Sequence, residues 1–176
     1  TSLYGYSKVY SEQHLVDLCF RDSLEYTNLR PPLVYGEGAP GNYDRVRSLM
    51  KRLRSLPVPL PDNDNRRTFL SINGLCTAVE VCLISAVTNG KSYVVADQKA
   101  ISTFQFFESI AAVTHTRLAH VRIPEYMCKV FSSVPILGKF YKNMYSDLEV
   151  VTSNELIDCG YEPFDTLSEF KKLVPD

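Results

Sequence analysis

The stretch Leu29-Arg30-Pro31-Pro32-Leu33-Val34-Tyr35-Gly36 carries an apolar run into a glycine-rich turn, and a helix-forming segment follows. We predict a strand over residues 24–35 and, after the turn, a helix that reaches about Ser55. Pro31 and Pro32 have no backbone N–H for a strand ladder, so this strand should end at a sheet edge or beside a ligand. A strand, a tight turn and a helix in this order are typical of α/β proteins.

The rest of the chain repeats this alternation. Helices are predicted over 5–22, 75–87, 104–113 and 125–133, and strands over 57–60, 68–72, 92–96 and 118–123. Capping-box patterns are found at Ser102/Gln105, Thr152/Glu155 and Thr166/Glu169, the last two opening short helices near the C-terminus. Strands that alternate with helices predict an α/β fold.

Composition narrows the class of protein. The 176 residues carry a formal net charge of -1, with 45% hydrophobic and 22% charged residues, which is ordinary for a globular protein. This balance predicts no nucleic-acid partner and no membrane association. The five cysteines are scattered without a CxxC pair, and the three histidines lack neighbouring ligands, so we expect a cytoplasmic protein without a metal site. Residue 1 is Thr, so we expect the natural N-terminus and any targeting segment to lie upstream.

A second motif opens the chain, Tyr4-Gly5-Tyr6-Ser7-Lys8, with Glu12 one helical turn later. Residues four apart on a helix point the same way, so the Lys8 ammonium can favour the phenolate of Tyr4 and lower its pKa. A tyrosine tuned in this way can serve as acid or base for a sugar hydroxyl near neutral pH. The chain has 11 tyrosines, so the same spacing also arises by chance on a solvated helix face, and the spacing alone leaves both interpretations open.

Three further features bear on anion binding. The glycine pattern of residues 36–41 follows a strand, but Pro40 inside it and the lack of a ribose-binding carboxylate argue against a dinucleotide fingerprint. A glycine-rich loop at a helix N-terminus still suits a phosphate, and Asn42 stands where a helix cap or a phosphate donor would. Arg67 at a strand start could pair with a pyrophosphate. We expect most of the basic residues on the helix after the loop to form a solvated face: Arg45, Arg47, Lys51, Arg52 and Arg54.

The ordered set of motifs resembles the C-terminal half of extended short-chain dehydrogenases/reductases, the nucleotide-sugar epimerase/dehydratase family. The matching segments are Tyr4-Gly5-x-Ser7-Lys8 with Glu12, residues 29–36, Gly41-Asn42, residues 65–69, residues 148–153 and Cys159-Gly160-Tyr161-x-Pro163. The resemblance implies an α/β fold, the C-terminal part of an extended Rossmann-like fold. Residues 1–36 would complete the NAD-binding domain. Residues 37–176 would form mainly the substrate lobe, with returning Rossmann elements.

The resemblance also implies how the site would work. Tyr4 would be the acid/base on the sugar O4, and Lys8 would tune it and hold the nicotinamide ribose. The nicotinamide end of NAD would lie against Pro31, Pro32 and Leu33. Tyr4 as a phenolate would take the O4 proton while C4 gives a hydride to NAD, and the hydride would return to the other face of the 4-keto sugar. The choice between NAD and NADP stays open, because its determinants lie upstream.

The substrate implied by the resemblance is a UDP-hexose or UDP-N-acetylhexosamine. Asn42 and Arg67 would bind its diphosphate, and the segment from Val58 to Leu60 would pass the uracil. Many relatives place another phosphate-binding arginine just before the last segment, but residues 143–147 contain none, which leaves diphosphate binding and the identity of the substrate open. Because the family's own glycine fingerprint would precede residue 1, we expect this chain to be inactive alone. A homodimer is expected for the longer protein.

Four functions remain to be distinguished at this point. The first is an NAD-dependent UDP-glucose or UDP-N-acetylglucosamine 4-epimerase, and the second is a UDP-4-keto-sugar C4 reductase of the same family. The third is a non-catalytic binding module that has kept the scaffold, and it predicts that Tyr4→Phe leaves the biological activity intact. A nucleic-acid binder working through the basic helix would instead show a steep salt dependence of its affinity.

Overall fold

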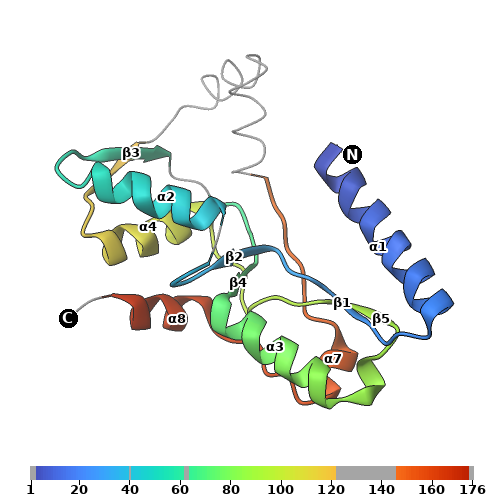
Figure 1. Cartoon of the computed structure of the whole chain (residues 1–176). Helices are drawn as coiled ribbons and strands as arrows, with labels where there is room; N and C mark the ends of the chain where they lie inside the picture. Colours follow the sequence, from blue (N-terminus) through green and yellow to red (C-terminus); the bar gives the residue numbers. More distant parts are fainter. Residues whose placement is uncertain (1–2, 40, 62–63, 122–145, 175–176) are drawn as a thin grey trace.

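The computed structural model describes residues 3–39, 41–61, 64–121 and 146–174, and the side chains of residues 4, 59–61, 120 and 121 lie outside this description. Its strands form three parallel pairs (Figure 1). The pairs are β1 (Thr27–Arg30) with β5 (Lys91–Val94), β2 (Leu33–Tyr35) with β4 (Phe69–Ser71), and β3 (Val58–Pro61) with β6 (Leu118–Val121). Parallel neighbours need crossover connections, which the helices between these strands supply. The α/β prediction is therefore confirmed.

The described residues form six α-helices, some of which pack against the β2/β4 pair. They are α1 (Leu3–Asp22), α2 (Asn42–Arg52), α3 (Ile72–Ile84), α4 (Thr103–Thr114), α7 (Asn154–Asp158) and α8 (Thr166–Leu173), with a 3-10 turn at Ala86–Thr88. Contacts join α2, α4 and α8 on one face, while α3 packs on the other (Figure 1). The helix predicted over residues 125–133 lies outside the described residues.

Two apolar cores form because neighbouring residues of a strand point to opposite faces. Phe69 of β4 stacks on Phe106 of α4 with ring centroids 3.9 Å apart, within the core shared by α2, α4 and α8. Leu70, the next residue, is fully buried in the second core beside Ala78 of α3. Two neighbouring residues of β4 therefore pack into different cores, Phe69 into the first and Leu70 into the second.

The single strand predicted over residues 24–35 is wrong in one respect. The structure has two strands, β1 and β2, which are separated at Pro31-Pro32 and pair with different partners. Neither proline can donate a ladder hydrogen bond, so the chain leaves one pair there and joins another. Gly36 then turns the chain at φ 126°, and a Cβ at this position would lie 2.7 Å from Cγ2 of Ile72. Only glycine fits this approach without a shift of Ile72, the first residue of α3.

Of the three predicted capping boxes, one is found in the structure and two are wrong. The capping box of Ser102 and Gln105 is confirmed, since the Ser102 hydroxyl accepts the Gln105 N–H at 3.0 Å. Thr152 does not cap α7 as predicted; Ser153 occupies the cap position. The Thr152 hydroxyl instead bonds both the N–H and the C=O of Ala96 at 3.0 and 2.8 Å, because these buried backbone groups have no strand partner there.

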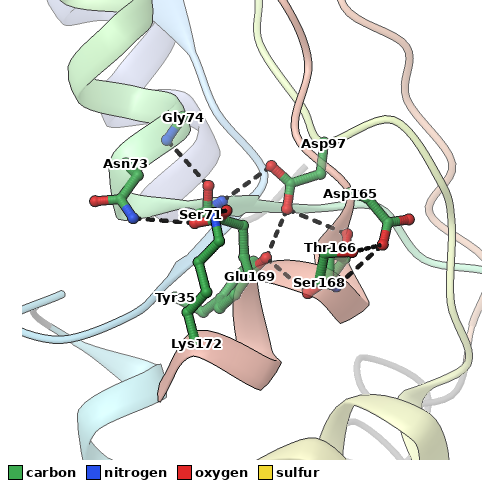
Figure 2. A network of polar contacts seen from close by, with 10 residues as sticks. All are labelled: Tyr35, Ser71, Asn73, Gly74, Asp97, Asp165, Thr166, Ser168, Glu169 and Lys172. Carbon is green, nitrogen blue, oxygen red and sulfur yellow. Dashed lines mark hydrogen bonds and ion pairs between the residues drawn. The ribbon is translucent and has the colours of Figure 1, made fainter. Parts of the chain in front are cut away.

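Thr166 is the second correction, and it leads to a buried polar network (Figure 2). Asp165 caps α8 by accepting the Ser168 N–H, while Thr166 turns its hydroxyl inward to Asp97 at 3.1 Å. The Asp97 carboxylate also accepts the Tyr35 hydroxyl at 2.8 Å and the Ser71 N–H at 3.1 Å. One buried carboxylate therefore ties β2, β4 and the C-terminal helix together.

Tyr161 gives a first prediction. Its side chain is fully buried, and its hydroxyl finds no hydrogen-bond partner among the described residues. A buried hydroxyl without a partner costs desolvation free energy that a phenyl ring does not. We expect Tyr161→Phe to raise the free energy of unfolding by about 1 kcal/mol, measured by urea denaturation. Tyr35→Phe is the matched control, because it removes a hydroxyl that is bonded to Asp97 and should lower stability; a loss of stability in both variants would contradict the prediction.

Candidate functional site

A cavity of about 960 Å³ lies where α1, the β1–β2 connection and the start of α2 meet. Its volume lies within the range of small-molecule sites. The cavity gathers residues that are far apart in the sequence. Of the predicted site residues, those that line it are Lys8, Pro31, Pro32, Leu33 and Asn42.

The α1 wall of the cavity carries the motif at the start of the chain. Lys8 and Glu12 both line the cavity, as their spacing of one helical turn requires. Tyr4 belongs to the same helix, four residues before Lys8, but its side chain lies outside the described residues. The predicted pairing of Tyr4 with Lys8 therefore stays a prediction.

An ion pair that the sequence analysis missed joins this wall to the sheet. The Arg30 Nε lies 3.1 Å from both carboxylate oxygens of Glu12, in a forked geometry. The pair links α1, the helix that carries Lys8, to β1 one residue before Pro31. The hydrogen bonds from Arg30 lower the pKa of Glu12. The one feature of the sequence that pointed to this ion pair was the position of Glu12, four residues after Lys8 on the same helix face.

The opposite wall is the N-terminus of α2. Gly41, with φ 98°, occupies the cap position, and no side chain caps the helix. The prediction that Asn42 stands at the cap is wrong, because Asn42 is the first helical residue; its role as a phosphate donor is untested. The uncapped N–H groups and the helix dipole give this end a partial positive charge, which suits a phosphate.

The remaining predicted residues lie away from this cavity. Arg67 is half-buried and does not line it; its Nη1 donates to the Ser146 carbonyl at 3.0 Å, and burial lowers its pKa. Its backbone N–H and C=O pair with Ile101 at 3.0 and 2.9 Å. Val58 lies half-buried on β3, and the side chain of Leu60 lies outside the described residues. The structure thus assembles the α1, proline and α2 parts of the predicted site.

Two kinds of site are absent from the residues that the structure describes. They contain no group of three His, Cys, Asp or Glu side chains placed to hold a metal ion. None of their helices combines the length and apolarity needed to cross a bilayer.

Comparison with known proteins identifies the family to which the chain belongs. Residues 1–96 match the model of the NAD dependent epimerase/dehydratase family, which covers more than half of the chain. The chain belongs to this family. It is 29% identical over 175 residues to the UDP-glucose 4-epimerase of Vibrio cholerae, covering 97% of this chain and 52% of that protein. The chain thus spans about half the length of this curated relative.

Solved structures share the fold. The UDP-glucose 4-epimerase of Thermotoga maritima with UDP-glucose superimposes with a TM-score of 0.63 at 18% identity, covering 99% of this chain and 52% of that one. The Thermus thermophilus UDP-glucose 4-epimerase in complex with NAD gives a TM-score of 0.61 at 18% identity, covering 96% of this chain and 53% of that one. The architecture is therefore part of a Rossmann-like fold with parallel strands.

The cavity residues fit the nicotinamide end of NAD, the cofactor of the family. Pro31, Pro32 and Leu33 form an apolar wall that suits a flat ring, and Lys8 on the opposite wall can hydrogen-bond a ribose hydroxyl. The α2 N-terminus with Asn42 opens into the same space and can take an anionic group.

The Glu12–Arg30 pair gives a second prediction. We expect Glu12→Gln to speed hydrogen exchange of the α1 amides about fivefold, since a partly exposed forked pair contributes at most about 1 kcal/mol. The lowered pKa of Glu12 means that this stabilisation is present above its ordinary pKa of 4.5 and is lost as the pH falls through the lowered value. The effect of the variant should therefore disappear in acid. Gln13→Ala on the same helix is the control, and equal acceleration in both variants would contradict a specific role for the pair.

Proposed function

We propose that the chain is the C-terminal portion of an NAD-dependent nucleotide-sugar 4-epimerase that interconverts UDP-glucose and UDP-galactose, or their N-acetylhexosamine counterparts. The observation that carries the proposal is the cavity in which Lys8, Pro31, Pro32, Leu33 and Asn42 converge. Similarity to a UDP-glucose 4-epimerase over 97% of the chain supports the substrate class.

In this proposal Tyr4 and Lys8 move the proton. Tyr4 as a phenolate removes the proton of the sugar O4 and later returns it, and the Lys8 ammonium favours the phenolate from one helical turn away. NAD, held against Pro31, Pro32 and Leu33, would supply the hydride chemistry at C4. The Glu12–Arg30 ion pair links α1 to the end of β1, which helps to position the tyrosine against the sugar.

The other residues of the site bind and orient. The apolar surface of Pro31, Pro32 and Leu33 holds the nicotinamide end and excludes water from the reacting carbon. Asn42 and the N-terminus of α2 receive the diphosphate of the substrate, with Arg67 as a second phosphate ligand and the segment from Val58 to Leu60 beside the uracil. Residues 1–36 complete the cofactor domain in this proposal, and the substrate lobe comes mainly from residues 37–176.

Product analysis tests the proposal. The complete protein is incubated with UDP-galactose, and separately with UDP-N-acetylgalactosamine, without added reduced cofactor. We expect UDP-glucose or UDP-N-acetylglucosamine to accumulate to an equilibrium mixture without net consumption of cofactor. A UDP-4-keto-hexose with added NADPH is the third substrate. Its reduction with stoichiometric consumption of NADPH, without interconversion of the other two UDP-sugars, would assign the C4 reductase instead. A lack of turnover with all three substrates would favour a binding module.

A further inference from the structure

A second hollow, of about 410 Å³, lies between α2 and the C-terminal ends of α4 and α8. It shares none of its lining residues with the cavity assigned to the nucleotide sugar. Its floor includes the buried side chains of Tyr43 and Thr114. Its lining also contains the basic residues Arg47, Lys51, Arg54 and Lys172, against a single carboxylate, Glu37. This excess of positive charge contrasts with the net charge of -1 for the whole chain.

The cations of α2 are placed to act together. Arg47, Lys51 and Arg54 follow one another at intervals of four and three residues, which is the spacing of one helix face. Leu53, the C-cap, keeps near-helical angles of φ -90° and ψ 6°, so Arg54 continues this face just beyond the helix. Over seven residues such a face extends about 10 Å, which is longer than one phosphate group.

Neighbouring carboxylates neutralise only part of the charge. Arg47 lies 4.0 Å from Asp44, and Lys172 pairs with the buried Glu169. For Lys51 and Arg54, the described part of the chain offers no carboxylate within ion-pair distance. These two exposed cations therefore remain available to an anion that enters the hollow.

His115 adds an independent observation. It ends α4 and lines the hollow in the left-handed conformation, with φ 53° and ψ 37°. Glycine is the usual residue at such a helix end, because a side chain strains this conformation. The chain places an imidazole here, and its ring N–H can donate to an anion.

We propose that this hollow binds a small anion that carries a diphosphate group. Two linked phosphates reach further along the Arg47–Lys51–Arg54 face than one phosphate does, and arginine guanidinium groups donate to phosphate oxygens in a forked geometry. The volume of the hollow accommodates a diphosphate together with a small organic group. The proposal is independent of the nucleotide-sugar site, because the two cavities have different lining residues.

Titration with inorganic pyrophosphate at constant ionic strength tests the proposal, with calorimetry for affinity and amide chemical shifts for location. The test variant is Lys51→Gln/Arg54→Gln. The matched control is Arg45→Gln/Arg52→Gln, which removes the same charge from exposed positions of the same segment outside the hollow. An Asn42→Ala variant reports binding at the other cavity. All these positions are exposed, and thermal unfolding of each variant verifies the fold.

We expect saturable binding with shifts at residues 47–54 and 113–116, and a loss of affinity of about tenfold or more in the test variant. The control should lose less than about twofold, because diffuse charge acts weakly through screening. His115→Gly should also weaken binding. An equal loss in test and control variants would show nonspecific attraction and overturn the proposal. A loss of affinity confined to Asn42→Ala would also overturn the proposal. Binding that does not saturate up to about 10 mM would overturn it as well, and would mean that these cations only complement the helix C-termini.

Discussion

The Tyr4→Phe variant of the complete protein is expected to lose epimerase kcat by about 10²- to 10⁴-fold, the contribution of a positioned proton-transfer group. Phenylalanine keeps the ring but cannot take the O4 proton, so chemistry should fail while the binding surfaces stay intact. We therefore expect the KM for UDP-galactose to change little. Steady-state kinetics with UDP-galactose, together with a titration of the substrate, provide both quantities.

The same helix supplies the control for this experiment. Tyr6 also belongs to α1 and is 72% exposed, so Tyr6→Phe removes the same hydroxyl at a position outside the cavity and should leave kcat unchanged. A Tyr4→Phe protein that kept more than about a tenth of the activity would contradict the assignment of Tyr4 as the acid/base. In that case the binding-module interpretation would gain support.

Replacement of Asp97 by alanine is expected to have the largest effect on stability, a loss of about 3 kcal/mol in the free energy of unfolding. The carboxylate accepts hydrogen bonds from Tyr35, Ser71 and Thr166, and all three partners are buried (Figure 2). Alanine would leave the buried Ser71 N–H without an acceptor. The hydroxyls of Tyr35 and Thr166 would keep only longer contacts, to the carbonyls of Thr166 at 3.2 Å and Lys99 at 3.5 Å. Urea denaturation measures the loss. Asp158→Ala, at an exposed position of α7, should change stability by less than about 0.5 kcal/mol.

The pH dependence separates the charge of Asp97 from its hydrogen bonds. Burial raises the pKa of Asp97 above its ordinary value of 3.8, and this outweighs the lowering by its hydrogen bonds. The folded state therefore binds the proton more tightly than the unfolded chain. This contribution to stability is fully present below pH 3.8 and is lost as the pH rises through the raised pKa.

Asp97→Asn should remove this part of the pH dependence, because the amide keeps the shape of the side chain and does not titrate. As the pH rises from about 4, the wild type should therefore lose stability relative to Asp97→Asn, as measured by the free energy of unfolding. A difference that is constant between pH 3 and 8 would contradict the buried, proton-binding carboxylate.

Local signals predicted much of the secondary structure. The helical spacing of the first segment, the capping box at Ser102 and the stop at Gly160 are all found in the structure, because each depends on residues a few positions apart. The helix α3 begins at Ile72, three residues earlier than predicted, since Ser71 caps it through the Gly74 N–H. The only local sign of this cap in the sequence is a serine at the end of a strand. That pattern does not by itself determine where a helix begins.

The candidate site was predictable only in part. The family resemblance pointed to Lys8, Pro31, Pro32, Leu33 and Asn42, which the fold brings to one cavity. The ion pair between Glu12 and Arg30 and the basic hollow at the end of α2 were not predicted. Both depend on side chains from segments that meet only after the parallel strands have paired.

The sequence by itself determined the alternation of helices and strands, the membership of the epimerase/dehydratase family and the spacing of the Tyr4–Lys8 motif. Only the tertiary structure decided that the chain changes partner strands at Pro31-Pro32 and that Thr166 serves Asp97 instead of capping a helix. The physical reason is the range of the interactions. Periodicity and capping act within one or two helical turns, whereas a buried carboxylate takes its donors from whichever segments the packed core brings to it.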